Sequence, residues 1–115
     1  MGVTKKRLYR AAERHPPRDK EYDPPAARGR ALPEGAPDEM RRSWDALSAW
    51  DTPEAAIESS HGMRSARCIV CYDIPENCRV TYEPSGDPGH FDIRGDYEEL
   101  KNYLSADKID LERRK

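Results

Sequence analysis

The sequence is 115 residues long, with ten prolines, 37% charged residues and 36% hydrophobic residues. This length leaves room for one domain, and the balance of charged and hydrophobic residues predicts that only part of it folds compactly. No run approaches the roughly 18 apolar residues that cross a bilayer, and the N-terminus lacks the apolar segment of a secretory signal. We therefore expect a soluble cytoplasmic protein that does not enter membranes.

The N-terminal segment combines one short element with a proline-rich stretch. Residues 6–12 are predicted as a short strand or the first turn of a helix, with Leu8 and Tyr9 as anchors. Residues 16–37 contain six prolines, which predicts an extended, polyproline-like or disordered chain. We therefore divide the chain into a basic, proline-rich, partly disordered arm (residues 1–36) and a compact domain (residues 37–115).

The net charge of -2 conceals the basic character of the N-terminal end. Residues 1–30 contain nine Lys or Arg against four Asp or Glu, whereas the remaining residues contain eleven against eighteen. A basic segment can contact a protein partner, nucleic acid or the acidic remainder of its own chain. We expect a protein partner, with nucleic acid as the less favoured alternative.

Two consecutive helices are predicted at the start of the compact domain. The first begins at Pro37 with an acidic turn, and its apolar positions at i, i+4 and i+7 share one face. These positions are Met40, Trp44 and Leu47. The second helix runs from the predicted N-cap Thr52, which is followed by a proline, to Gly62.

Three short strands are predicted in the second half of the chain. Residues 66–74 are rich in β-branched and aromatic residues, which is typical of a buried strand. Residues 78–83 and 90–94 alternate apolar and polar positions, as strands with one solvated face do. These strands predict a small, mostly antiparallel sheet.

A third helix is predicted from Asp96 to about residue 105, because Asp96 and Glu99 form a capping box ahead of an apolar stripe. The following residues, 106–111, can form an edge strand or a further helical turn. Together the elements predict an α+β fold: a small mostly antiparallel sheet with three helices and an extended Pro-rich N-terminal arm.

The three cysteines and a histidine are the residue types of a zinc site, but their spacing does not give the geometry that zinc needs. Cys68, Cys71, Cys78 and His61 would make a tetrahedral ligand set. In a strand, however, residues three apart point to opposite faces, so Cys68 and Cys71 do not converge. The sequence therefore predicts buried, reduced thiols and no metal.

Two segments resemble the ADP-ribosyltransferase-like fold of small bacterial toxins. They are the Leu-Tyr-Arg triplet that ends at Arg10, and residues 47–56 (LSAWDTPEAA), where a serine precedes an alanine-rich helix. The resemblance implies that Arg10 contacts a nicotinamide dinucleotide, that Ser48 lies on a strand instead of a helix end, and that a late glutamate completes the catalytic set. No Glu-x-Glu or Gln-x-Glu motif is present, so Glu83 stands in for that glutamate.

Three aromatic or imidazole side chains are further candidates for ligand or partner binding. Tyr9 precedes Arg10, and Trp50 is either a core residue or the wall of a pocket. His90 begins a strand next to a loop rich in glycine and proline, where both binding residues and ordinary turn residues occur.

These observations leave two functions from different classes. The first is a non-catalytic protein-binding module of bacterial or phage type, without a cofactor, whose basic arm becomes ordered on a partner. The alternative is a toxin-type, ADP-ribosyltransferase-like effector that uses Arg10, Ser48 and Glu83 on a nicotinamide dinucleotide. The two differ in whether Arg10 and Ser48 converge on one cleft.

Overall fold

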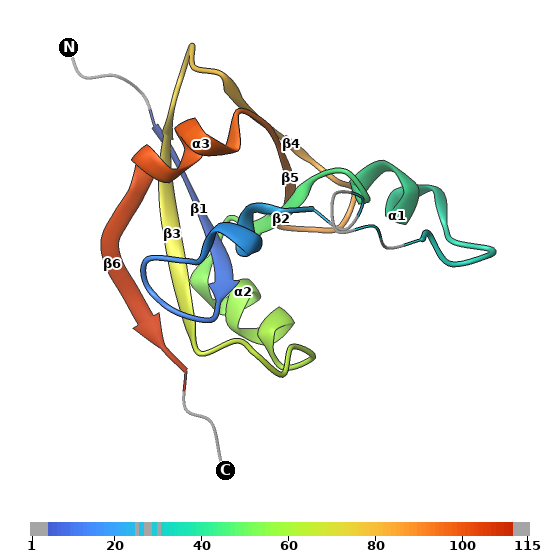
Figure 1. Cartoon of the computed structure of the whole chain (residues 1–115), viewed down its shortest axis with the longest axis horizontal. Coiled ribbons are helices and arrows are strands. Elements are labelled where there is room, and N and C mark those ends of the chain that lie inside the picture. Colours follow the sequence, from blue (N-terminus) through green and yellow to red (C-terminus); the bar gives the residue numbers. More distant parts are fainter. Residues whose placement is uncertain (1–4, 25, 27–28, 30, 112–115) are drawn as a thin grey trace.

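The described part of the chain folds around one six-stranded sheet in which all neighbouring strands are antiparallel (Figure 1). The computed structural model describes residues 5–24, 26, 29 and 31–111. The strand order across the sheet is β4-β5-β2-β1-β3-β6. The bounds of the strands are Lys5–Ala12 (β1), Leu47–Trp50 (β2), Cys68–Pro75 (β3), Val80–Pro84 (β4), His90–Gly95 (β5) and Leu104–Asp110 (β6).

The longest strand pairing joins β1 to β3. It comprises eight residue pairs, from Lys5 opposite Pro75 to Ala12 opposite Cys68. The sequence of β3, CIVCYDIP, is rich in β-branched and aromatic residues, and most of it is buried on both faces. Because β1 also pairs with β2, both of its edges are occupied and it is an interior strand of the sheet.

Short helical segments connect the strands in the described residues. The side chain of Thr52 caps α2 by accepting a hydrogen bond from the backbone N–H of Ala55 at 3.2 Å. Asp96 caps α3 in the same way, with the N–H of Glu99 at 3.1 Å. None of these helices has the length and apolar character needed to cross a membrane. Their bounds are Asp19–Tyr22 (η1, 3-10), Asp38–Ser43 (α1), Pro53–Ser60 (α2), Tyr97–Leu100 (α3) and Lys101–Tyr103 (η2, 3-10).

The main hydrophobic core lies on one face of the sheet. Leu8, Tyr72 and Ile93 come from three different strands and are fully buried there. Tyr22 of η1 and Leu100 of α3 pack against them, so these helical segments cover the core face. The core therefore depends on residues from both ends of the chain.

A smaller apolar layer lies on the opposite face, under α2. Alternation along β3 turns Ile69 and Cys71 away from the main core. Pro53, the first residue of α2, lines a hollow together with these two residues, and Ala56 in the same helix is fully buried. Both faces of β3 are therefore covered.

The predicted α+β fold, with three helices packed on a small sheet, is wrong. The sheet extends from residue 5 to residue 110 instead of from 66 to 94, and the helices are only one or two turns long. Residues 47–50, predicted as the end of the first helix, form β2, because Leu47 and Ala49 alternate with exposed or half-buried neighbours as a strand requires. The third helix ends at Leu100, and β6 begins soon after it.

The prediction of an extended N-terminal arm is also wrong for the part of residues 1–36 that the structure describes. Residues 5–12 form β1 in the sheet interior, and Tyr22 is buried in the core. Pairing with β3 and β2 decides this outcome, because it supplies partners that the local sequence does not reveal. The parts of the predicted arm at residues 1–4, 25, 27–28 and 30 lie outside the described residues.

The sheet consists of two three-stranded halves, β4-β5-β2 and β1-β3-β6. Strands β1 and β2 join the halves, and their register contains one residue pair, Tyr9 opposite Trp50. In Figure 1, β6, β3 and β1 lie side by side, while β2, β5 and β4 continue toward α1. The two halves therefore separate beyond Tyr9, and this separation positions the candidate site.

Arg7 and Asp73 form an ion pair across β1 and β3. The Nε and Nη2 atoms of Arg7 donate to the carboxylate of Asp73 at 2.7 and 2.8 Å, and this hydrogen bonding lowers the pKa of Asp73. The pKa is thus lower in the folded than in the unfolded chain, so the pair stabilises the fold above about pH 4 and its contribution is lost as the pH falls further.

Replacing Asp73 with asparagine should lower the free energy of unfolding by about 0.5–1 kcal/mol at neutral pH, since the pair is partly exposed. In strong acid, where Asp73 is protonated, the two chains should unfold at the same urea concentration. Urea denaturation of both chains across the acid range measures this difference. A difference of equal size at neutral and acid pH would contradict the assigned role of the pair.

Candidate functional site

The candidate site lies where β1 and β2 separate. Arg10 is the first residue of β1 after the Tyr9–Trp50 pair, and its side chain reaches across to β2. Its Nε donates to the backbone carbonyl of Ser48 at 2.8 Å, and its Nη1 donates to the carbonyl of Glu21 at 3.2 Å. Arg10 thus connects β2 and η1 from an interior strand.

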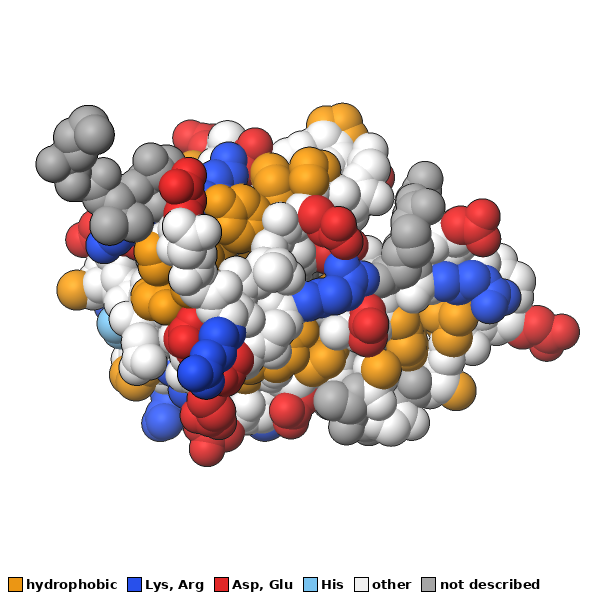
Figure 2. Space-filling view, turned by 90° about the horizontal axis from the view of Figure 1, so that it is seen from above, with side chains coloured by type: hydrophobic (Ala, Val, Ile, Leu, Met, Phe, Trp, Pro, Cys, Tyr) orange, Lys and Arg blue, Asp and Glu red, His pale blue; other side chains and the backbone are white. Residues whose placement is uncertain are grey.

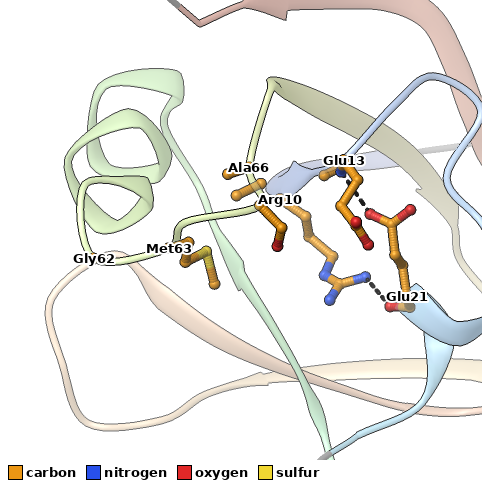
Figure 3. Close-up of a pocket in the computed structure, with 9 residues that line it drawn as sticks. Arg10, Glu13, Glu21, Gly62, Met63 and Ala66 are labelled. Carbon is orange, nitrogen blue, oxygen red and sulfur yellow. Dashed lines mark hydrogen bonds between the residues drawn. The ribbon is translucent and has the colours of Figure 1, made fainter. Parts of the chain in front are cut away.

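A cleft of about 360 Å³ opens beside Arg10 and is called the Arg10 cleft below (Figure 3). Its walls come from the end of β1, from η1 and from the loop after α2. Figure 3 shows the guanidinium of Arg10 directed toward the backbone of Glu21. The labelled residues of the wall are Arg10, Glu13, Glu21, Gly62, Met63 and Ala66.

Both carboxylates in the wall of the Arg10 cleft have partners within the chain. The carboxylate of Glu21 accepts hydrogen bonds from the backbone N–H groups of Glu13 and Arg18, both at 2.7 Å. The carboxylate of Glu13 lies 3.2 Å from Nζ of Lys20. Their negative charges are therefore compensated, and neither carboxylate forms a salt bridge with Arg10.

Two buried tyrosines lie on the core side of Arg10. The hydroxyls of Tyr72 and Tyr22 are hydrogen-bonded at 3.0 Å, and the two rings meet edge to face. Burial raises the pKa of both phenols, whereas the positive charge of Arg10 works in the opposite direction. The net pKa of each is raised, so both remain neutral at neutral pH beside the Arg10 guanidinium.

The predicted ligand-binding residues Tyr9, Trp50 and His90 lie next to one another across three strands. Trp50 is opposite Tyr9 on one side and opposite His90 on the other. The rings of Trp50 and His90 meet edge to face with centroids 4.7 Å apart, and Nδ1 of His90 lies 2.5 Å from the hydroxyl of Ser85. His90 is only 8% exposed, whereas Tyr9 and Trp50 are half-buried.

The predicted catalytic residues are brought together only in part. Arg10 and Ser48 meet, but through the backbone carbonyl of Ser48 and not through its hydroxyl. Glu83 lies on β4, opposite Asp92 of β5, and its carboxylate accepts a hydrogen bond from Arg94 at 2.9 Å. Neither Ser48 nor Glu83 is part of the wall of the Arg10 cleft, so of the three predicted residues only Arg10 lines it.

Other residues around the Arg10 cleft and on β5 could not be identified as site residues from the sequence. Glu13, Glu21 and Met63 carry no motif, because loops that are distant in sequence bring them to the cleft. Asp92 is the clearest omission, since it is 3% exposed although it occupies a polar position of an alternating strand. The alternation predicts a solvated position for Asp92, and its burial depends on packing that the local sequence does not show.

The cysteines do not converge on a metal site. The thiol of Cys68 is directed to the carbonyl of Ala12, and that of Cys71 to the carbonyl of Asp107 on β6. Among the described residues, no three His, Cys, Asp or Glu side chains form a group that could hold a metal ion.

Comparison with known proteins adds no relative. No protein-family model, curated protein or solved structure matches this chain. The interpretation of the site therefore depends on its own geometry.

Proposed function

We propose that this chain binds a nicotinamide dinucleotide in the Arg10 cleft, as the resemblance to ADP-ribosyltransferase-like proteins implies. The observation that carries the proposal is the 2.8 Å contact between Nε of Arg10 and the carbonyl of Ser48. The resemblance requires Arg10 and Ser48 at one place and Ser48 on a strand ahead of a helix. The position of β2, with α2 directly after it, supports the second requirement. The first is met by the contact between the two residues, although only Arg10 lines the cleft.

The chemistry of Arg10 suits a pyrophosphate. Its guanidinium presents several N–H donors in a plane, and phosphate oxygens accept such donors in pairs. The acceptors of Arg10 in this structure are two carbonyls and the hydroxyl of Tyr72, all of them neutral, and their hydrogen bonds are weaker than those of a charged phosphate oxygen. A pyrophosphate that enters the cleft would therefore form stronger hydrogen bonds with Arg10 than these neutral acceptors do.

The proposal is limited to dinucleotide binding. ADP-ribosyl transfer in the resembling family needs a late glutamate in the same cleft. Glu83 instead pairs with Arg94, and two strands, β5 and β2, lie between its strand β4 and β1. No transfer step is therefore assigned to Glu83.

A protein-binding module built on a free basic arm finds less support. Residues 5–12 carry part of the basic charge, and they are held in the sheet as β1. On the face seen in Figure 2, Lys and Arg side chains alternate with Asp and Glu side chains, so this face has no single basic surface. A protein partner, or nucleic acid at the basic end, stays a prediction.

The state of the cysteine thiols supports a proposal for the cellular compartment of the protein. Cys68, Cys71 and Cys78 are free, and burial raises the pKa of the Cys68 and Cys71 thiols. Free thiols fit a reducing compartment, so the proposed location is the cytoplasm.

Replacing Arg10 with alanine should weaken binding of the oxidised nicotinamide dinucleotide about tenfold or more, because charge-assisted hydrogen bonds to phosphate are lost. The measurement is a titration followed in the two-dimensional amide NMR spectrum of the labelled chain. In the parent chain, the shifts should gather at residues 9–13, at Glu21 and at Met63. In the Arg10→Ala chain, they should appear only at much higher ligand concentration.

Arg7→Ala is the matched control, since Arg7 lies on the same strand but pairs with Asp73 outside the cleft. This variant should bind the dinucleotide like the parent chain, and Ser48→Ala should retain most of the binding because Ser48 contributes its carbonyl. Equal binding by Arg10→Ala and the parent chain, or no saturable shift in the parent chain, would end the proposal.

A further inference from the structure

Asp92 is a buried aspartate with an unused acceptor. It lies in the middle of β5, opposite Ser48 on β2 and opposite Glu83 on β4. Its Oδ2 accepts a hydrogen bond from the hydroxyl of Ser43 at 3.0 Å, and the residue is 3% exposed. Its Oδ1 is buried and has no hydrogen-bond partner among the described residues.

An unpartnered oxygen of this kind is unfavourable. Burying a carboxylate removes its water, and a buried acceptor without a donor costs about 1–3 kcal/mol or more. Folded proteins rarely retain such atoms unless an ordered water, a bound group or a function accounts for them. Asp92 is thus prepared for a donor that the described residues do not supply.

Asp92 lines a hollow of about 340 Å³, called the Asp92 hollow below. A second carboxylate, that of Glu83, and the hydroxyl of Ser85 lie in the same wall. None of the residues that form the wall is a lysine or arginine. The hollow is therefore acidic, and it is separate from the Arg10 cleft because the two share no wall residue.

The neighbouring Arg94 does not donate a hydrogen bond to Oδ1 of Asp92. Arg94 donates to Asp45 at 3.1 Å and to Glu83 at 2.9 Å. Partial burial opposes the charge of Arg94, but the hydrogen bond to Asp45 and the charges of Asp45, Asp92 and Glu83 raise its pKa overall. The surroundings of Asp92 therefore stabilise positive charge.

We propose that the Asp92 hollow binds an organic cation with N–H donors, namely a guanidinium group. Oδ1 of Asp92 is closed to solvent in this structure, so its side chain has to turn toward the hollow before such a group can supply the donor that Oδ1 lacks. The planar set of N–H groups can bind Glu83 at the same time. A metal ion is a poorer occupant, because no group of three ligating side chains forms among the described residues. The guanidinium can come from a small molecule or from an arginine of a peptide.

The test is a titration of the full-length labelled chain with agmatine, which carries a guanidinium, followed by amide NMR. Saturable shifts should gather at residues 83–86 and at Asp92. Tetramethylammonium carries the same charge without N–H donors, so it should produce no saturable shift there. The peptide Gly-Arg-Gly distinguishes the two sources: tighter binding of the peptide assigns the hollow to a peptide arginine, and tighter binding of agmatine assigns it to a small molecule.

Asp92→Asn should weaken agmatine binding about tenfold or more, because a charged acceptor is lost. Glu83→Gln changes an exposed side chain and should also weaken binding, so it provides the test if Asp92→Asn does not fold. Glu98→Gln, at an acidic residue of another hollow, should bind like the parent chain. The proposal is overturned by the absence of agmatine shifts, by equal binding of tetramethylammonium, or by unchanged binding in Asp92→Asn or Glu83→Gln.

Discussion

Replacing Leu8 with alanine should lower the free energy of unfolding by about 2–5 kcal/mol. Leu8 is fully buried in β1, between β2 and β3, where its side chain packs with Tyr72 in the main core. Truncation removes buried apolar atoms and leaves a cavity. The cavity cannot close, because the neighbouring strands on both sides hold its walls in place. Urea denaturation followed by the fluorescence of Trp44 and Trp50 measures the loss.

The control is Ile109→Ala, because Ile109 is also an aliphatic strand residue but is 38% exposed on the edge strand β6. This variant should lose less than about 1 kcal/mol. Equal losses for the two variants, or no loss for Leu8→Ala, would mean that residues 5–12 are an arm and not part of the sheet. Removal of residues 1–35 should abolish the cooperative unfolding transition for the same reason.

Strands β3, β4 and β5 were predicted correctly because their signals are local, whereas β6 begins inside the predicted third helix. Residues 66–74 contain consecutive β-branched and aromatic residues, and β3 occupies Cys68–Pro75. The alternation at residues 90–94 likewise predicted β5 at His90–Gly95. The caps Thr52 and Asp96 also act within a few residues of their own position, so both were confirmed.

Strand β2 was mistaken for a helix end because one spacing fits two structures. Leu47 follows Trp44 by three residues, which fits a helical face, but Leu47 and Ala49 also alternate, which fits a strand. Pairing with β5 decides between them, since it joins Leu47 to Ile93 in the core. Only the resemblance to ADP-ribosyltransferase-like proteins implied a strand at this position.

Strand β1 could not be assigned from the sequence for a related reason. Its local pattern left a strand and a helical turn open, and its partners in β3, from Pro75 opposite Lys5 to Cys68 opposite Ala12, lie far along the chain. The unpartnered oxygen of Asp92 is equally non-local, because it depends on where Ser43 and the neighbouring strands place their donors. The resemblance left open whether Arg10 and Ser48 converge, and the contact that joins them uses the backbone carbonyl of Ser48, which no side-chain pattern reveals.

Replacing Gly95 with alanine should lower the free energy of unfolding by about 2–4 kcal/mol. Gly95 ends β5 with φ of +113°, a conformation that residues with a Cβ rarely adopt, and an added Cβ would lie 2.1 Å from the carbonyl oxygen of Arg79. The same carbonyl accepts the N–H of Asp96, which caps α3. The β4 backbone would have to move away, which weakens both the β4–β5 pairing and the start of α3.

Gly62→Ala is the matched control, since an added Cβ at Gly62 meets no heavy atom within 4 Å. Its free energy of unfolding should stay within about 0.5 kcal/mol of the parent value. In the Gly95→Ala chain, amide protection should fall first at residues 96–100, because α3 loses its cap geometry before the β1–β3 pairing is affected. If Gly95→Ala unfolds at the same urea concentration as Gly62→Ala, the tight contact at Gly95 is not needed for the β4–β5 pairing or for the start of α3, and the prediction is wrong.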